Sequence, residues 1–302
     1  MDYRRANRAY LYMILSTIAL VVVLSLWYLN GGPEISILVN NIISEGVVLI
    51  PAVAAVLYSG DRLSVLVPIR KIKLTSALLT VIYIILLFPL VTFVNAISML
   101  FVENTVSAIS DDVLAMPIWL MLLSIGILGP LVEEIVFRGV LLQSYQRTGR
   151  IIGSILLSSI LFGMMHMNFN QFAYGAVMGI MLALLVEATG TVTSSFIAHA
   201  LFNSIEVIMM YVSSDAIDEA TEMAEDYLES MNFIYYAILF VAAVIFTVGA
   251  VMIVRKIAQI EEREEFFDNM PKCKKKGYKL ITLPLIIAMI LAVAYMIFSA
   301  SL

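Results

Sequence analysis

The chain has 302 residues, of which 62% are hydrophobic and 14% are charged, and its mean hydropathy is +0.98. A soluble domain is about half apolar and about a quarter charged, so this composition excludes a soluble protein and predicts a polytopic membrane protein. The formal net charge is −5, and the single cysteine, Cys273, excludes an intramolecular disulfide and a Cys-rich metal site. The sequence carries no nucleotide-binding or nucleic-acid-binding signature, so we expect no nucleic-acid partner.

Apolar segments long enough to cross a bilayer recur along the whole chain. A helix needs about 20 residues to span a hydrocarbon core of about 30 Å. The fifth and sixth segments are short, and the turn between them is minimal, so they form either two spans or one re-entrant hairpin. The sequence therefore predicts an all-α bundle of eight or nine transmembrane helices. The segments are 9–29, 36–58, 76–101, 114–145, 151–167, 171–188, 191–211, 233–254 and 280–300.

Basic residues mark one side of the membrane. The alternate connections 30–35, 102–113, 168–170 and 212–232 contain no lysine or arginine. The positive-inside rule then predicts a cytoplasmic N-terminus in a multi-pass protein of the bacterial cytoplasmic membrane. The basic residues on the cytoplasmic side are Arg4, Arg5, Arg8, Arg62, Arg70, Lys71, Lys73, Arg147, Arg150 and a cluster from Arg255 to Lys279.

Two segments outside the spans have a distinct composition. Residues 215–231 are acidic with apolar positions at helical spacing, which predicts an amphipathic helix on the outer face. This helix is either a solvated cap or a contact for a partner or substrate. On the cytoplasmic side, Lys272 and the lysines at 274–276 either fix the topology or bind anionic lipid, so membrane lipids are expected partners.

The fourth span contains two adjacent carboxylates and an arginine in an otherwise apolar run from Gly129 to Gly139. A charge at the centre of a bilayer costs at least ~3 kcal/mol, so such groups face a partner or a wet cavity. Glu134 and Arg138 are four residues apart and share one helix face, which predicts an ion pair. Glu133 is rotated by about 100° from Glu134 and has no partner on its own helix. Gly129-Pro130 is expected to break or kink the helix and to open a cavity there.

The only two histidines of the chain, His166 and His199, both lie within predicted spans. Phe162 and His166 share one helix face, and so do His199 and Asn203. Counted along their helices, these side chains and Glu133 all reach the middle of the membrane, where we expect them to line one cavity. Glu206 follows on the face of His199 and Asn203, either as a supporting acid or as a pairing group in the outer cavity.

The residue types in this cavity suit hydrolysis of an amide by water. A carboxylate can act as general base, and an imidazole can hold the same water or pass its proton to the leaving amine. A second imidazole and a carboxamide supply donors for the oxyanion. His, His and Glu also form a partial zinc site, but the His-Glu-x-x-His spacing is absent and the groups come from three separate spans.

The three motifs together resemble the CPBP (Abi) family of intramembrane proteases, which includes the Rce1-type CAAX prenyl proteases. They are Glu-Glu-x-x-x-Arg from Glu133, Phe-x-x-x-His ending at His166 and His-x-x-x-Asn from His199, and they lie within residues 115–210. The resemblance implies a glutamate-type endopeptidase that needs no cofactor and no metal, although the family was formerly classed as metalloprotease.

The resemblance also implies a role for each matched residue. Glu133 and His166 would activate water, and His199 and Asn203 would bind the oxyanion. Supporting roles fall to Glu134, Arg138 and Phe162. The substrate would be a peptide or a membrane protein, cut near the cytoplasmic leaflet. The core carrying these motifs is expected at 114–211, between N-terminal transmembrane helices at 1–113 and a C-terminal part at 212–302, all within a single integral domain.

Two other functions remain open from the residues alone. Glutamate and histidine in mid-membrane also serve proton-relay transporters, but the sequence shows no recognisable inverted repeat or pair of broken helices. A non-catalytic membrane protein that acts by binding, such as a bacteriocin self-immunity factor, is the third hypothesis.

Overall fold

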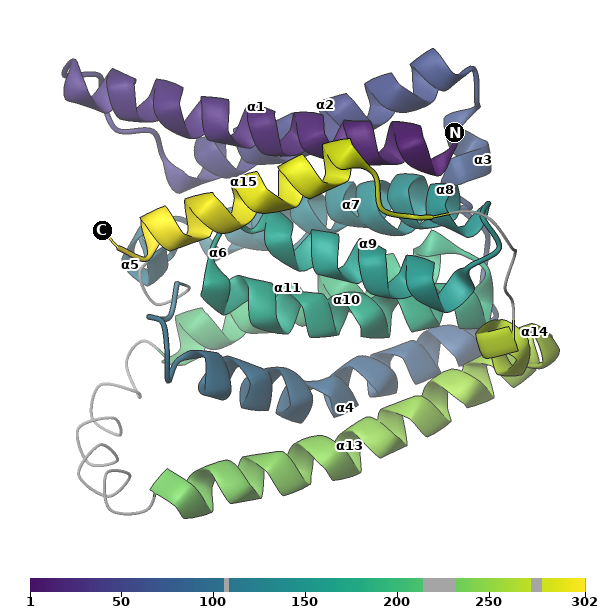
Figure 1. Ribbon diagram of the computed structural model, residues 1–302. Coiled ribbons are helices and arrows are strands. Elements are labelled where there is room, and N and C mark those ends of the chain that lie inside the picture. The colour runs from purple at the N-terminus through teal and green to yellow at the C-terminus, as the bar shows by residue number, and fades with distance from the viewer. Residues whose placement is uncertain (106–108, 214–231, 273–278, 302) are drawn as a thin grey trace.

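A computed structural model describes residues 1–105, 109–213, 232–272 and 279–301, and this part of the chain contains helices and no strands. The predicted all-α class is therefore confirmed (Figure 1). The helices are α1 Tyr3–Leu29, α2 Ile37–Ser59, α3 Leu63–Leu66, α4 Leu74–Ser98, α5 Ser110–Leu114, α6 Ile118–Met121, α7 Gly129–Glu133, α8 Leu142–Gln146, α9 Ile151–Met165, α10 Phe169–Thr189, α11 Val192–Ser213, α13 Asn232–Ile260, α14 Glu264–Asn269 and α15 Leu283–Ser299, with π-helices at Leu122–Leu128 and Glu134–Leu141 and a 3-10 turn at Met270–Lys272.

The helices include enough long apolar segments for a multi-pass integral membrane protein. Seven helical stretches are long and apolar enough to cross a membrane, and α9 and α15 are shorter apolar helices. Together they correspond to the nine segments that the sequence predicts, with α13 extending to Ile260 rather than ending at 254. The acidic segment 215–231 and Cys273 lie outside the described residues.

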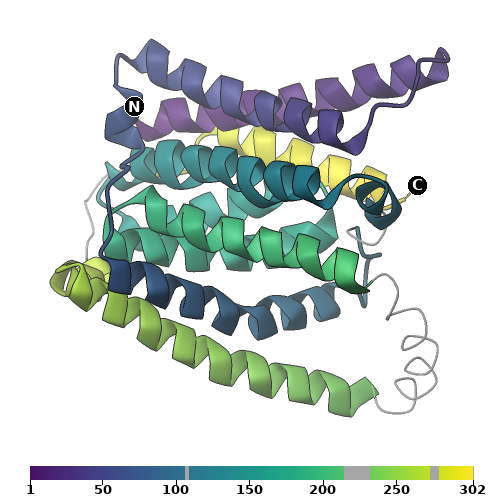
Figure 2. The same cartoon turned by 180° about the vertical axis from the view of Figure 1, so that it is seen from behind.

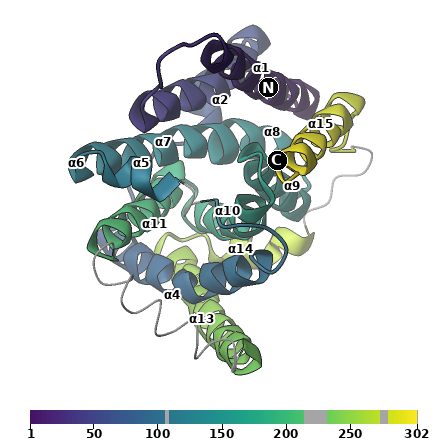
Figure 3. The ribbon, with the colours of Figure 1, turned by 90° about the vertical axis from the view of Figure 1, so that its left-hand side faces the viewer.

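The bundle is layered, with α10 at its centre (Figure 3). The pair α1 and α2 lies on one side with α15, and α4 and α13 lie on the opposite side (Figures 1 and 2). The end-on view shows that the long helix containing α6, α7 and α8 runs between the α1–α2 pair and the interior (Figure 3). Buried tyrosines connect the layers, since Tyr10 Oη donates to Leu161 O at 3.0 Å and Tyr83 Oη donates to Met181 O at 2.8 Å.

The helix from Ile118 to Gln146 is continuous, so of the two expected effects of Gly129-Pro130, a break or a kink, the break does not occur. The backbone widens instead, because π-helical turns lie on both sides of α7. The Gly129 N–H donates to Ser124 O, five residues back, which is the π-helical register. In that register the N–H of residue 130 would pair with Ile125 O, and proline has no N–H to give. The carbonyl of Ile125 is thus left for another donor.

Helices α9 and α10 are distinct antiparallel helices joined by a tight turn. Met167 adopts a left-handed conformation with φ 57°, and Asn168 caps α10 because its side chain accepts the Gln171 N–H at 2.8 Å. The two helices approach closely at Gly163. A Cβ atom there would lie 2.6 Å from Phe172 O and 2.8 Å from Ala176 N.

This contact makes the Gly163→Ala variant a test of the α9–α10 packing. Alanine gains about 1 kcal/mol of helix propensity, but the clash is with backbone atoms that cannot move aside. We expect a net loss of about 1–3 kcal/mol in the free energy of unfolding, measured as a lower thermal midpoint in detergent. Gly46→Ala is the matched control, because a Cβ at Gly46 meets nothing within 4 Å. Equal midpoints for the two variants would contradict the packing.

Candidate active site

The polar side chains singled out in the sequence come together from three helices. Glu133 ends α7, His166 caps the C-terminus of α9, and His199 and Asn203 lie one turn apart on α11. Glu133 Oε2 lies 3.5 Å from His199 Nε2, and Glu133 Oε1 lies 4.0 Å from His166 Nε2. The predicted convergence on one region is present.

The expected ion pair between Glu134 and Arg138 is also present. Glu134 Oε1 lies 3.0 Å from Arg138 Nη1, and the two side chains are 0% and 1% exposed. The same Glu134 oxygen lies 3.0 Å from His199 Nδ1, a contact that sequence spacing did not predict. Glu134 is therefore shared between a cation on its own helix and an imidazole on α11.

Phe162 lies at the centre of this cluster. Its ring centroid is 5.1 Å from that of His166 and 5.7 Å from that of His199, both edge to face. The guanidinium carbon of Arg138 lies 4.2 Å from the centroid of the same ring. A cation over an aromatic face is stabilised by the ring quadrupole, most strongly where water is excluded. Phe162 thereby fixes three of the polar groups that surround it.

Hydrogen bonds define which nitrogen of each imidazole carries a proton. His166 Nδ1 lies 3.0 Å from Phe162 O, and a carbonyl oxygen only accepts, so Nδ1 is the donor. Nε2 of a neutral His166 is then a lone-pair acceptor that faces Glu133. His199 Nδ1 likewise donates to the carboxylate of Glu134, which leaves Nε2 to face Glu133 from α11.

Asn203 is held by the irregular backbone of the neighbouring helix. Its Nδ2 donates to Ile125 O at 3.2 Å. This is the carbonyl that loses its helical partner because residue 130 is proline. Pro130 therefore affects the site through Asn203 and not through Glu133. It leaves Ile125 O free to accept a hydrogen bond from the Asn203 carboxamide. One N–H of Asn203 remains for another acceptor.

A cavity of about 170 Å³ joins these groups. Glu133, His166, His199 and Asn203 all line it, and its apolar wall includes Val113 and Met210. These last two residues lie on α5 and at the C-terminal end of α11, so the cavity extends away from the end of the bundle where the arginines gather.

Two further carboxylates lie near the site. Glu206 lines the cavity from α11 with an exposed side chain, as its helical position predicts. The residues predicted from the sequence did not include Glu45, which lies on α2. Its position as an acidic residue within the predicted span 36–58 could have marked it as a candidate site residue. Its Oε1 lies 3.3 Å from the place that a Cβ on Gly129 would occupy. Oε2 of Glu45 is buried with no hydrogen-bond partner among the described residues.

The histidines and glutamates of the site are residue types that also bind metal ions. Within residues 1–105, 109–213, 232–272 and 279–301, no three His, Cys, Asp or Glu side chains are grouped so that they could hold a metal ion. His199 directs Nδ1 to Glu134 and Nε2 to Glu133, and His166 Nδ1 is occupied by Phe162 O. Each Nδ1 is thus engaged within the protein, and each Nε2 faces Glu133.

The Glu134–Arg138 pair gives a direct prediction. Arg138→Met keeps the volume of the side chain but leaves Glu134 buried without its cation, and breaking a buried pair costs about 3–5 kcal/mol of unfolding free energy. The loss is measured by thermal or SDS-induced unfolding of the purified protein. The double variant Glu134→Gln/Arg138→Met removes both charges and should recover much of that stability. A single variant as stable as wild type would show that Arg138 does not balance Glu134.

Comparison with known proteins identifies the segment that carries the site. A family model described as type II CAAX prenyl endopeptidase Rce1-like matches residues 115–205. The putative membrane peptidase YdiL of Bacillus subtilis is 34% identical over 108 residues, or 35% of this chain and 43% of that protein. The membrane-embedded CAAX protease MroQ of Staphylococcus aureus is 31% identical over 130 residues, or 41% of this chain and 50% of that protein.

The aligned regions thus span half or less of the length of these curated relatives. No solved structure matches the chain. The matched residues 115–205 include Glu133, Glu134, Arg138, the Phe162–His166 motif and the His199–Asn203 motif. The resemblance that these motifs indicated is confirmed, because residues 115–205 match the Rce1-like family model.

Proposed function

We propose that this chain is an intramembrane endopeptidase in which Glu133 and His166 activate a water molecule. The observation that carries the proposal is the approach of Glu133 Oε1 to His166 Nε2 at 4.0 Å. Both atoms are acceptors when the glutamate is ionised and the imidazole is neutral, so they do not bond to each other. A water molecule on the cavity side can donate one hydrogen to each, which orients its oxygen lone pairs toward a substrate.

The reaction follows from this geometry. The water oxygen forms a bond to the peptide carbonyl carbon while Glu133 takes one of its protons. The carbonyl π electrons move to oxygen, and the tetrahedral intermediate then expels the amine. Glu133 returns this proton to the leaving nitrogen, directly or by way of His166 Nε2, so a carboxylic acid and an amine are released and the site regains its starting protonation state.

His199 and Asn203 are proposed to bind the oxyanion. Because His199 Nδ1 already donates to Glu134, Nε2 can donate only if the ring carries both protons. The proposal therefore requires His199 to carry both protons when the oxyanion forms. Asn203 contributes its second N–H, since the first donates to Ile125 O. Removing one oxyanion donor typically lowers kcat by about 10²–10³.

The substrate class follows from the cavity. Its apolar walls and volume of about 170 Å³ suit an extended peptide segment rather than a folded domain. The sequence suggested cleavage near the cytoplasmic leaflet, but the cavity extends away from the arginine-rich end. We therefore propose that a peptide or membrane-protein segment enters from that opposite side. The named relatives come from bacteria, which supports a bacterial cytoplasmic membrane as the location.

The first test replaces the general base. Glu133→Gln keeps the shape of the side chain but removes the basic oxygen, and His166→Ala removes the second water acceptor. We expect each variant to lower kcat by at least about 10²-fold on peptide substrates presented to the purified protein in liposomes. Glu34→Gln, on the outer connection far along the chain from the motifs, is the matched control. Full cleavage by Glu133→Gln would refute the proposal, and proton flux lost in the same variant would instead favour a proton-relay transporter.

A second test addresses the absence of a metal ligand set. Because no three His, Cys, Asp or Glu side chains in the described part of the chain are grouped so that they could hold a metal ion, we propose that no metal takes part. Incubation with 1,10-phenanthroline should leave cleavage unchanged, and elemental analysis of the active protein should find far less than one zinc per chain. Loss of cleavage on chelation, with recovery on added zinc, would overturn the metal-free mechanism while leaving the peptidase assignment intact.

A further inference from the structure

A groove of about 580 Å³ runs between α1 and α2, beside the first half of α1 and the second half of α2. Arg5 and Arg8 line it at its polar end, and Tyr12 and Tyr58 are exposed on its walls. Its floor includes the small side chains of Ala54 and Ala55. None of these residues lines the cavity that contains Glu133.

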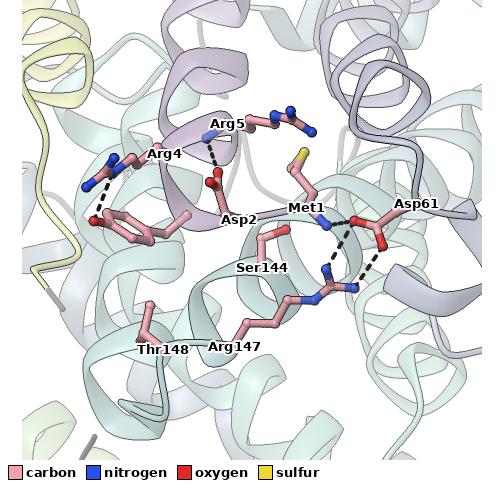
Figure 4. Close-up of a pocket in the computed structure, with 9 residues that line it drawn as sticks. Met1, Asp2, Arg4, Arg5, Asp61, Ser144, Arg147 and Thr148 are labelled. Carbon is pink, nitrogen blue, oxygen red and sulfur yellow. Dashed lines mark hydrogen bonds and ion pairs between the residues drawn. The ribbon is translucent and has the colours of Figure 1, made fainter. Parts of the chain in front are cut away.

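The two arginines of the groove have no acidic partner. In the part of the chain that the structure describes, neither guanidinium forms an ion pair or a hydrogen bond, and both side chains are exposed. The neighbouring pocket, of about 600 Å³, shares Arg5 with the groove and also contains Arg147, which has an acidic partner. There Arg147 Nη1 lies 3.1 Å from Asp61 Oδ2, whereas Arg5 engages Asp2 only through its backbone N–H (Figure 4).

The charged end and the apolar surface of the groove favour a ligand that is anionic at one end and apolar along its length. Two unpaired guanidinium groups attract an anion and bind phosphate oxygens well. Tyrosines of this kind sit at the level of lipid headgroups. The alanine floor then continues along membrane-spanning helices, where an acyl chain would cover it. A free phosphate would contact only the arginines and would not cover the apolar surface of the two alanines. The groove is therefore complementary to a whole lipid, with a headgroup and an acyl chain.

We propose that this groove binds one anionic phospholipid, with its phosphate at Arg5 and Arg8 and an acyl chain along Ala54 and Ala55. The binding is electrostatic at the headgroup and apolar below it. Each basic group near an anionic lipid surface contributes about a fivefold increase in affinity. Loss of both is therefore expected to weaken the retention of the lipid by roughly 30-fold.

The test measures lipid retention by native mass spectrometry of the full chain released from nanodiscs that contain equal amounts of phosphatidylglycerol and phosphatidylcholine. Wild type should retain one phosphatidylglycerol per chain. Arg5→Gln/Arg8→Gln should lose it, and Arg62→Gln should keep it, because Arg62 is an exposed arginine that does not line the groove. Ala54→Leu fills the floor and should also lose the lipid.

The other outcomes separate the possible sources of the signal. Unchanged thermal midpoints in all variants show that the loss is not unfolding. Displacement of the lipid by millimolar inorganic phosphate would mean that the arginines bind phosphate alone, which overturns the proposal. Equal retention of phosphatidylcholine, or full retention of phosphatidylglycerol by the Arg5→Gln/Arg8→Gln variant, would overturn it as well.

Discussion

The buried pair of Glu134 and Arg138 is the constraint on which the site depends. In a low-dielectric interior a charge without a partner is very costly, so the two side chains, at 0% and 1% exposure, fix each other. Glu134 in turn holds His199 Nδ1 at 3.0 Å and so decides which nitrogen of that ring faces Glu133. The remaining face of the guanidinium lies over Phe162, whose ring contacts both histidines. An ion pair that is structural in itself thus sets the orientation and the proton position of the imidazole beside Glu133.

The irregular backbone of the helix from Ile118 to Gln146 makes a second contribution. Two adjacent glutamates point about 100° apart on a helix, which lets Glu134 face Arg138 while Glu133 faces the cavity. The π-helical stretch before Gly129 accommodates Pro130 without breaking the helix, and it leaves Ile125 O to Asn203. Non-helical pairing of the backbone is tolerated in a membrane only where the freed groups find partners within the protein. Here that requirement positions a carboxamide at the cavity wall.

The sequence predicts those features that depend on spacing along one helix. The membrane spans follow from apolar length, and the Glu134–Arg138 pair follows from a separation of four residues. The proximity of Glu133 to His166 and His199 was predicted from the depth of each residue in the membrane. That depth follows from counting residues along each predicted span. The bond between His199 and Glu134 was not predictable, because 65 residues separate them and the rotation of α11 about its axis depends on packing. For the same reason nothing in the local sequence paired Asn203 with Ile125, or brought Glu45 of α2 to Gly129.

Helix α2 connects two parts of the molecule that the sequence leaves separate. Its C-terminal half supplies Ala54, Ala55 and Tyr58 to the groove beside α1, and its N-terminal half carries Glu45 to the backbone of α7. Glu133 ends α7, so α2 packs against the element that carries this second carboxylate. Because a helix moves as a rigid element, any displacement of α2 changes the spacing of these carboxylates. The surroundings of Glu133 therefore depend on the position of a helix that contains none of the three motifs.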